Sequence, residues 1–153
     1  IKKSTAGLSA CCGFLLFKYD HVKLEHRIKV CAVVMHLVCH RFNEGKPAYS
    51  PQQMHQITRI PQQLINRAVN ELLKAKLLVE IRLEKRGSFE ESIVLHPIEK
   101  IDHLTYGVMI ERLFTSGEDV AALADLNQEW AMWKDIDLVN STFVESGRKI
   151  HFV

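Results

Sequence analysis

The stretch Ser50–Glu84 constrains the fold more than any other part of this chain. It reads SPQQMHQITRIPQQLINRAVNELLKAKLLVEIRLE, which predicts a short helix, a tight turn, a longer helix and a strand. Ser50 can cap the first helix, Pro51 suits its first position, and Gln53 stands where the partner in a capping box would. This order of elements predicts a helix-turn-helix followed by the first wing strand of a winged-helix domain.

The two helices predicted in this stretch differ in how their apolar and polar residues are arranged. Met54 and Ile57 give the short helix one apolar edge, residues 58–60 make the turn, and Pro61 starts the longer helix. Apolar residues spaced i, i+3, i+4, i+7 and i+8 form one buried stripe: Ile65, Ala68, Val69, Leu72 and Leu73. The opposite face is polar and consists of Gln62, Gln63, Asn66, Arg67, Asn70 and Lys74. In a DNA-binding winged helix, such a polar face enters the major groove.

Residues 19–43 precede this stretch and predict one long helix. Its helical stripe consists of Leu24, Ile28, Cys31, Ala32, Met35, Cys39 and Phe42. Further valines and a leucine fill much of the remaining circumference. A helix that is apolar nearly all round is either central to a core or shared with a second chain. The turn residues Asn43–Pro47 end it.

After the helix-turn-helix, the sequence predicts a hairpin. Residues 79–84 alternate between apolar and charged side chains, which indicates a strand whose buried face is Val79, Ile81 and Leu83. Ser92–Ile98 predicts the returning strand, and Pro97 fits its end because proline cannot donate to a ladder.

Helices are expected again beyond the hairpin. Thr105 can cap one helix, Leu104 can staple onto Met109, and Gly117 is a natural stop. The inward-facing residues of that helix are expected to be Ile110, Leu113 and Phe114. A further helix is predicted over residues 118–134, with Leu123, Leu126, Trp130 and Trp133 along one side. For residues 135–153, continuation of that helix and a strand at Lys149–Val153 both remain open.

These patterns predict a mainly α fold with a small β-hairpin, a winged helix with helical extensions. Three segments follow from them. Residues 1–18 are an apolar lead-in, residues 19–117 the winged-helix domain, and residues 118–153 a C-terminal helical extension or tail.

The charge of the chain bears on nucleic-acid binding. Its 153 residues carry a formal charge of +2 and a pI near 8.4, whereas nucleic-acid binders often exceed a domain pI of about 9. Arg82, Lys85 and Arg86 in the wing could touch phosphates. Five glutamates flank the same surface: Glu71, Glu80, Glu84, Glu90 and Glu91. DNA is therefore a possible partner that the sequence does not favour.

The sequence predicts no catalytic centre, cofactor or metal site. It contains no GxSxG, phosphate-binding loop or dinucleotide fingerprint. His36 and His40 stand four apart, but Leu37 replaces the glutamate of an HExxH site. The four cysteines, Cys11, Cys12, Cys31 and Cys39, follow no CxxC spacing, so free thiols in a reducing cytoplasm are expected.

The apolar segment Gly7–Phe17 raises the question of a membrane. The chain starts at Ile1, so it is expected to be a fragment or a processed product. The segment covers about eleven residues, where a membrane span needs roughly 20. It is therefore interpreted as a buried or interfacial helix, or as the end of a membrane helix. Basic residues follow it, which usually lie on the cytoplasmic side: Lys18, Lys23, Arg27 and Lys29.

Residues from about Tyr19 to Gly117 resemble a known family. The segments KVCAVVMHLVCHRFNEGKPAYS, IPQQLINRAVNELLKAKLLVEI and IDHLTYGVMIERL are similar to the C-terminal cytoplasmic region of the YihY/BrkB family of bacterial inner-membrane proteins, formerly labelled ribonuclease BN. The resemblance implies a bundle of membrane helices ahead of this domain, with Gly7–Phe17 as the exit from the last one. The ribonuclease label carries no catalytic motif onto any residue here.

The function expected from the sequence is protein–protein contact, self-association or regulation by a non-enzymatic domain at the cytoplasmic face of the bacterial inner membrane. The expected contact surfaces are the helix over residues 19–43 and the pair Trp130 and Trp133, since exposed apolar patches mark interfaces. A winged-helix transcription regulator is the first alternative. The second is a ribonuclease that processes transfer RNA precursors, following the old family label.

Overall fold

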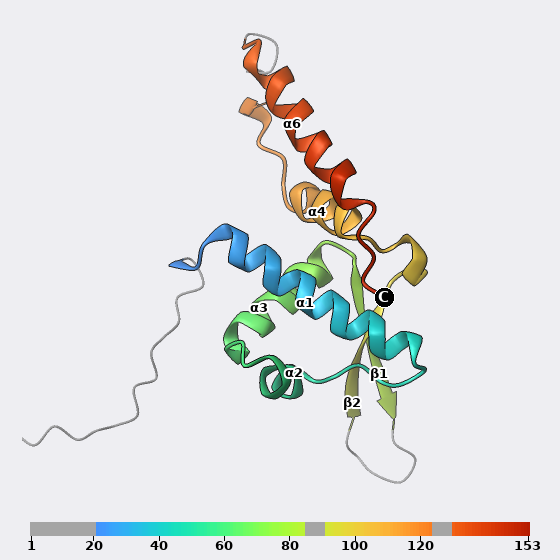
Figure 1. Ribbon diagram of the computed structural model, residues 1–153. Helices are drawn as coiled ribbons and strands as arrows, with labels where there is room; N and C mark the ends of the chain where they lie inside the picture. The colour runs from blue at the N-terminus through green and yellow to red at the C-terminus, as the bar shows by residue number, and fades with distance from the viewer. Residues whose placement is uncertain (1–20, 85–90, 124–129) are drawn as a thin grey trace, which may run out of the picture.

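The structure is a computed structural model that describes residues 21–84, 91–123 and 130–153 (Figure 1). The main elements are α1 (Leu24–Asn43), α2 (Pro51–Thr58), α3 (Gln62–Lys74), β1 (Leu78–Glu84), β2 (Glu91–Pro97), the 3-10 turn η2 (Ile101–His103), α4 (Tyr106–Thr115) and α6 (Met132–Gly147). Helices dominate, and β1 and β2 pair as a two-stranded antiparallel sheet. The prediction of a mainly α fold with a small hairpin is therefore confirmed.

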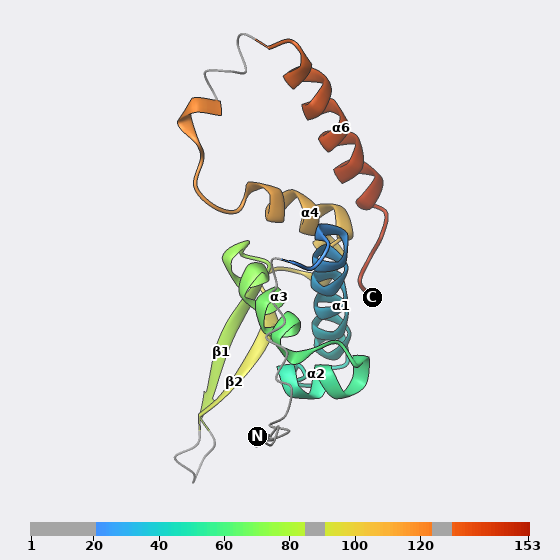
Figure 2. The same cartoon turned by 90° about the vertical axis from the view of Figure 1, so that its left-hand side faces the viewer.

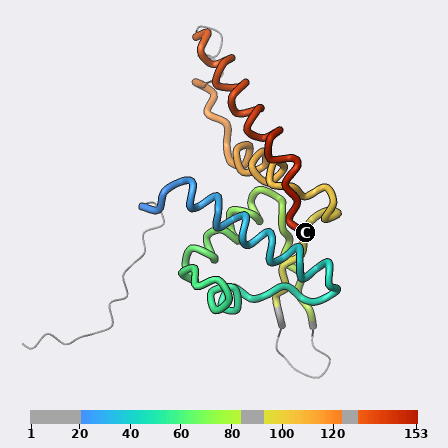
Figure 3. The backbone as a smooth tube through the Cα atoms, in the orientation of Figure 1, coloured from blue at the N-terminus to red at the C-terminus, as the bar shows by residue number. Residues whose placement is uncertain are grey.

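Helix α1 is the centre of the core. It packs against α3, β2 and α4 and crosses in front of α3 and the hairpin in Figures 1 and 3. Its buried residues are Val30, Cys31, Val34, Met35, Val38 and Cys39. The helix begins at Leu24, not at residue 19 as predicted, because Lys23 adopts an extended backbone (φ −52°, ψ 137°). Its predicted end is confirmed, with Gly45 in a left-handed conformation at φ 67°.

The segment from α2 to α3 follows its predicted boundaries. The Ser50 hydroxyl accepts a hydrogen bond from the Gln53 amide at 3.3 Å, and the Gln53 side chain accepts one from the Ser50 amide at 2.9 Å. Arg59 makes the turn in a left-handed conformation. Of the two residues on the apolar edge of α2, Met54 is fully buried and Ile57 is 53% exposed. The two-turn α2 covers only a short patch of α3 and leaves Ile57, near its C-terminal end, uncovered.

The hairpin forms with Ile81 opposite Val94, and β2 ends at Pro97 as predicted. The prediction that one face of β1 is buried is wrong. Its apolar residues Val79, Ile81 and Leu83 are 39%, 37% and 45% exposed. The hairpin extends beyond the helices (Figure 1), so its outer part gains little cover from them.

The C-terminal third departs most from the sequence prediction. Thr105 caps α4 by accepting from the Val108 amide at 3.3 Å, and Leu104, Met109 and Ile110 are buried as predicted. Leu113 is half-buried against the core, but Phe114 is 50% exposed. The single helix predicted over residues 118–134 is wrong, because residues 118–120 and 130–131 are not helical. Leu126 lies outside the described residues.

Helix α6 occupies the region for which the sequence left two alternatives open. It runs from Met132 to Gly147, so its main part lies beyond the predicted helix. The chain then turns back along α1. Tyr106 donates its amide to the Ile150 carbonyl at 2.8 Å, and Thr105 pairs with His151 in an isolated antiparallel bridge. The helical alternative therefore holds up to Gly147, whereas Lys149–Val153 forms one isolated bridge at His151 and no strand. Phe152 joins the core at 6% exposure.

Candidate functional site

The polar face of α3 is the first candidate surface. The apolar stripe of this helix is buried, except that Leu73 is half-buried. The polar residues Gln62, Asn66, Arg67, Asn70 and Lys74 are exposed, and Gln63 is half-buried. These side chains can make bidentate contacts to base edges. The predicted surface therefore exists and is open to solvent.

The charge near this face is modest. Lys76 and Arg82 are exposed beside α3 and on β1, and Glu80 lies on the same strand as Arg82. Lys85 and Arg86, predicted to touch phosphates, lie outside the described residues. Binding to a polyanion depends on neutralising several phosphates, so the described part of this surface is weakly equipped for it.

The base of α6 is the second candidate region, and it is held by close backbone contact with α4. A Cβ atom on Gly107 would lie 2.4 Å from the Val144 carbonyl oxygen and 2.6 Å from the Arg148 nitrogen. A Cβ atom on Gly147 would lie 2.8 Å from the Gly107 nitrogen. Only glycine fits both positions, so the two helices meet here with no side chain between their backbones.

Side chains complete the same junction. The ring of Phe143 lies 6.5 Å from that of Tyr106 and 6.3 Å from that of Phe114. The guanidinium of Arg148 donates to the Glu111 carboxylate on α4 at 3.0 Å and to Glu145 at 2.7 Å. These contacts fix the C-terminal half of α6 on α4.

The N-terminal half of α6 projects from the body of the protein. Figure 2 shows this part standing apart from segment 116–123, which leads out from α4. Met132, Ile136 and Val139 are 48%, 39% and 67% exposed. We call the outer half of α6, residues 132–139, together with the exposed apolar residues Val120, Leu123 and Trp130 that precede it in the chain, the arm. Val120 and Leu123 are also exposed, at 60% and 48%.

The two tryptophans proposed as contact residues belong to the arm. Trp130 is 49% exposed and precedes α6, and Trp133 is half-buried in its first turn. The Trp133 Nε1 atom is buried and has no hydrogen-bond acceptor in the described part of the chain. A buried indole donor normally has a partner. The first turn of α6 therefore carries a hydrogen-bond donor that no acceptor among the described residues meets.

Helix α1, the other proposed contact surface, is occupied by the core. One side of it packs against α3, β2 and α4. Leu24 and Phe42 are 61% and 43% exposed at its two ends, and the Phe42 ring lies 5.2 Å from that of His96 on β2. Of the two alternatives for this helix, the structure shows the central core helix.

The two described cysteines are buried on α1. The Cys31 thiol donates to the Glu71 carboxylate at 3.7 Å. Burial raises the pKa of Cys31 to about 12, with the negative charge of Glu71 adding to the effect, and burial raises the pKa of Cys39 to about 11. Both thiols stay protonated at neutral pH, which makes them poor nucleophiles.

Two hollows lie near the C-terminal end of α4. One of about 260 Å³ is lined by apolar side chains with Arg27, Cys31 and Glu71. A shallow one of about 780 Å³ is lined by Lys74, Lys76, Glu99, Arg112 and neighbouring residues. Arg112 pairs with Glu99 and donates to the Lys76 carbonyl at 2.8 Å. This ion pair and this hydrogen bond of Arg112 therefore connect α4 to the residues that follow α3 and β2.

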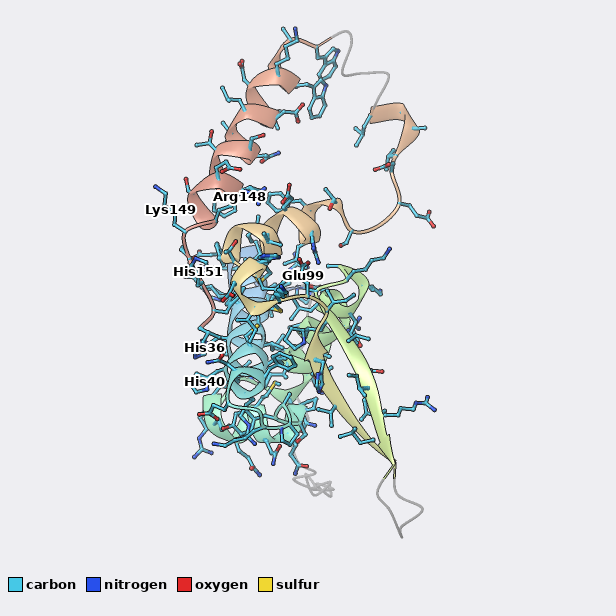
Figure 4. The ribbon with its side chains drawn as sticks, turned by 90° about the vertical axis from the view of Figure 1, so that its right-hand side faces the viewer. His36, His40, Glu99, Arg148, Lys149 and His151 are labelled. Carbon is cyan, nitrogen blue, oxygen red and sulfur yellow. The ribbon has the colours of Figure 1, made fainter. Side chains whose placement is uncertain are left out.

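His36 and His40 of α1 make contacts within the fold. Figure 4 shows His36 and His40 close together along α1, with His151 on the C-terminal segment. The rings of His36 and His40 lie 5.8 Å apart, and the His36 Nδ1 atom contacts the Phe152 carbonyl at 2.7 Å, where only the ring can donate. Among residues 21–84, 91–123 and 130–153, no cluster of three or more His, Cys, Asp or Glu residues could hold a metal ion.

Comparison with known proteins adds no assignment: no family model and no curated protein matches this chain. Within the described ranges, no helix has both the length and the apolar character needed to cross a membrane. Gly7–Phe17, the segment interpreted as the possible end of such a helix, lies outside them, as do Cys11 and Cys12.

The sequence predictions missed the exposed stripe of α6. Met132, Ile136 and Val139 follow helical spacing in the sequence, and that spacing could have identified them. The alternative spacing of leucines and tryptophans over residues 118–134 placed the helix too early. The structure therefore places α1 in the core and shows an exposed apolar stripe on the outer half of α6, which also carries Trp133.

Proposed function

We propose that this chain is a non-enzymatic winged-helix domain whose function is to bind protein, with its arm as the contact surface. The order α1, α2, turn, α3 and hairpin supports a winged helix, since α3 is amphipathic and follows a tight turn after α2. The resemblance to the YihY/BrkB family supports a place at the cytoplasmic face of a bacterial inner membrane.

One observation carries this proposal: the outer half of α6 exposes its apolar side chains. Met132 and Val139 are 48% and 67% exposed, although both belong to the apolar stripe of α6. Isolated helices of fewer than about 12–15 residues are marginal in water, and the projecting part of α6, residues 132–139, is shorter than that. A projecting helix of this kind is therefore expected to be stabilised by another protein surface.

DNA binding is the competing function, and the exposed polar face of α3 is the observation in its favour. It predicts binding to duplex DNA with a steep dependence on salt. Arg67→Ala would then relax sequence preference, whereas Lys74→Ala would weaken binding to all sequences alike. Fluorescence anisotropy with duplex DNA at low salt measures both. Absence of binding would remove this function for the domain.

A photo-crosslinking experiment in host cells separates the two functions. A photoreactive amino acid replaces Leu123 on the arm in one variant and Asn70 on α3 in another, because both positions are exposed. We expect protein adducts from position 123 and no nucleic-acid adducts from position 70. Nucleic-acid adducts from position 70, with none of protein from position 123, would contradict the proposal.

A further inference from the structure

The apolar residues of α6 follow the spacing of a coiled-coil seam. Met132, Ile136, Val139 and Phe143 are separated by four, three and four residues. This is the alternation of d and a positions in a heptad repeat, where each side chain inserts between residues of a facing helix. A facing helix therefore fits this seam.

Within the described residues, only the base of this seam has a partner. Phe143 contacts the rings of Tyr106 and Phe114 from α4. Val139, one turn further out, is 67% exposed. Leu138 is 66% exposed, but helical spacing places it on the other side of α6, beside Lys134 and Ser141.

The seam exposes an apolar surface of moderate size. Met132, Ile136, Val139, Phe143 and the neighbouring Phe114 are 48%, 39%, 67%, 44% and 50% exposed, which corresponds to roughly 500 Å² of surface, below the about 800 Å² per partner of a standard complex. The largest patches that single-chain proteins expose reach about 300–600 Å² and often mark interaction sites.

The chemistry beside the seam fits an identical helix. Its flanking positions are largely uncharged, since Trp133, Asn140 and Thr142 lie beside Ile136, Val139 and Phe143, and Asp135 is the charged exception. A partner of opposite charge would find few charges to pair with. A second α6 offers the same apolar seam, and a two-fold axis makes one surface complementary to itself.

We propose that α6 pairs with α6 of a second copy of this chain, in antiparallel orientation. Ile136 then faces Val139 of the second copy, and Met132 at each tip reaches Phe143 at the other base. Phe114, 50% exposed beside that base, gains cover from the arriving tip. This inference rests on the proposed function, because it names the protein that the arm binds.

Sedimentation of the whole chain tests the pairing. Ile136→Asp and Val139→Asp each place a charge in the seam, whereas Leu138→Asp places the same charge on the opposite side of the helix. We expect the wild type and Leu138→Asp to sediment as dimers, at twice 17.6 kDa. The two seam variants should associate at least ~100-fold more weakly, because an unpaired charge is costly to bury. Unchanged circular dichroism would show that they fold.

The orientation has its own test, in a background with Cys11 and Cys12 replaced by serine. The single variants Ile136→Cys and Val139→Cys are mixed and oxidised, and we expect the disulfide to join position 136 of one chain to position 139 of the other. Dominant links between identical positions would overturn the antiparallel arrangement.

A monomeric wild type, or equal dissociation by Leu138→Asp and the seam variants, would overturn pairing through the seam. If the wild type is monomeric but position 123 still crosslinks another protein in cells, the proposed function stands and only the second copy is wrong. If neither is seen, both fail.

Discussion

Helices α1 and α6 are both long and rich in apolar residues, yet only α1 is covered. α1 buries six side chains beneath α3, β2 and α4. α6 buries only Val144 and Gly147 near its base, while Val139 remains 67% exposed. The apolar content of a helix therefore does not show whether it belongs to a core or to an interface. What distinguishes them is the element packed against the helix.

The largest difference is expected from two leucine truncations in core and arm. Leu72 on α3 is fully buried and Leu138 on α6 is 66% exposed. Leu72→Ala should lower the free energy of unfolding by ~2–5 kcal/mol, since it leaves a cavity. Leu138→Ala should change it by less than ~0.5 kcal/mol. Urea denaturation measures both. Similar losses would show that the outer part of α6 is covered in the folded chain.

Adding one methyl group where α4 contacts the base of α6 should lower the free energy of unfolding. In Gly107→Ala, the new Cβ would collide with the Val144 carbonyl and the Arg148 nitrogen. We expect a loss of ~1–3 kcal/mol from overpacking, together with faster hydrogen exchange in α6. The control is Ser146→Ala, which changes an exposed residue of α6 beside Gly147. Normal exchange in Gly107→Ala would contradict the close backbone contact.

Removing the N-terminal cap of α2 should have a smaller effect on the stability of the fold. Ser50→Ala removes the acceptor for the Gln53 amide and should cost ~1 kcal/mol. Ser50→Asp retains an acceptor and should preserve most of the stability. Thermal unfolding compares the variants, and equal melting temperatures for all three proteins would remove the capping box from the account.

The smallest expected effect on stability near neutral pH comes from ionisation of the Cys31 thiol. Its pKa is raised to about 12 in the fold by burial, whereas an unfolded cysteine titrates near 8.5. The folded state therefore keeps the proton longer, so stability is complete below about pH 8.5 and falls as pH rises toward 12, by up to ~1.4 kcal/mol per pH unit. Urea unfolding between pH 7 and 10 should show this slope reduced in Cys31→Ala. An unchanged slope would exclude Cys31 as its source.

The sequence predicted the parts of the fold that depend on neighbours along the chain. The capping box at Ser50, the turn at Arg59 and the cap at Thr105 are local hydrogen bonds, and all three occur. The buried stripe of α3 was also predictable, because four of its five residues lie at helical spacing and are buried.

Properties that depend on distant segments were not predictable in the same way. Val79, Ile81 and Leu83 alternate as a buried strand face does, but the hairpin extends beyond the helices and leaves them exposed. The limits of α6 were missed because residues 118–134 also offer apolar residues at helical spacing. Of the candidate sites, five of the six polar residues predicted on the face of α3 are exposed and Gln63 is half-buried, whereas the seam of α6 was missed although its spacing is present in the sequence.

Hydrogen exchange at two protein concentrations tests the contrast between α1 and α6 most directly. Amides of residues 132–139 should exchange rapidly in dilute protein and become protected as concentration rises, because a second chain covers them. Amides of residues 30–39 on α1 should be protected at both concentrations. Protection of α6 that equals that of α1 and does not depend on concentration would contradict the account, since it would mean that α6 is stable without a partner.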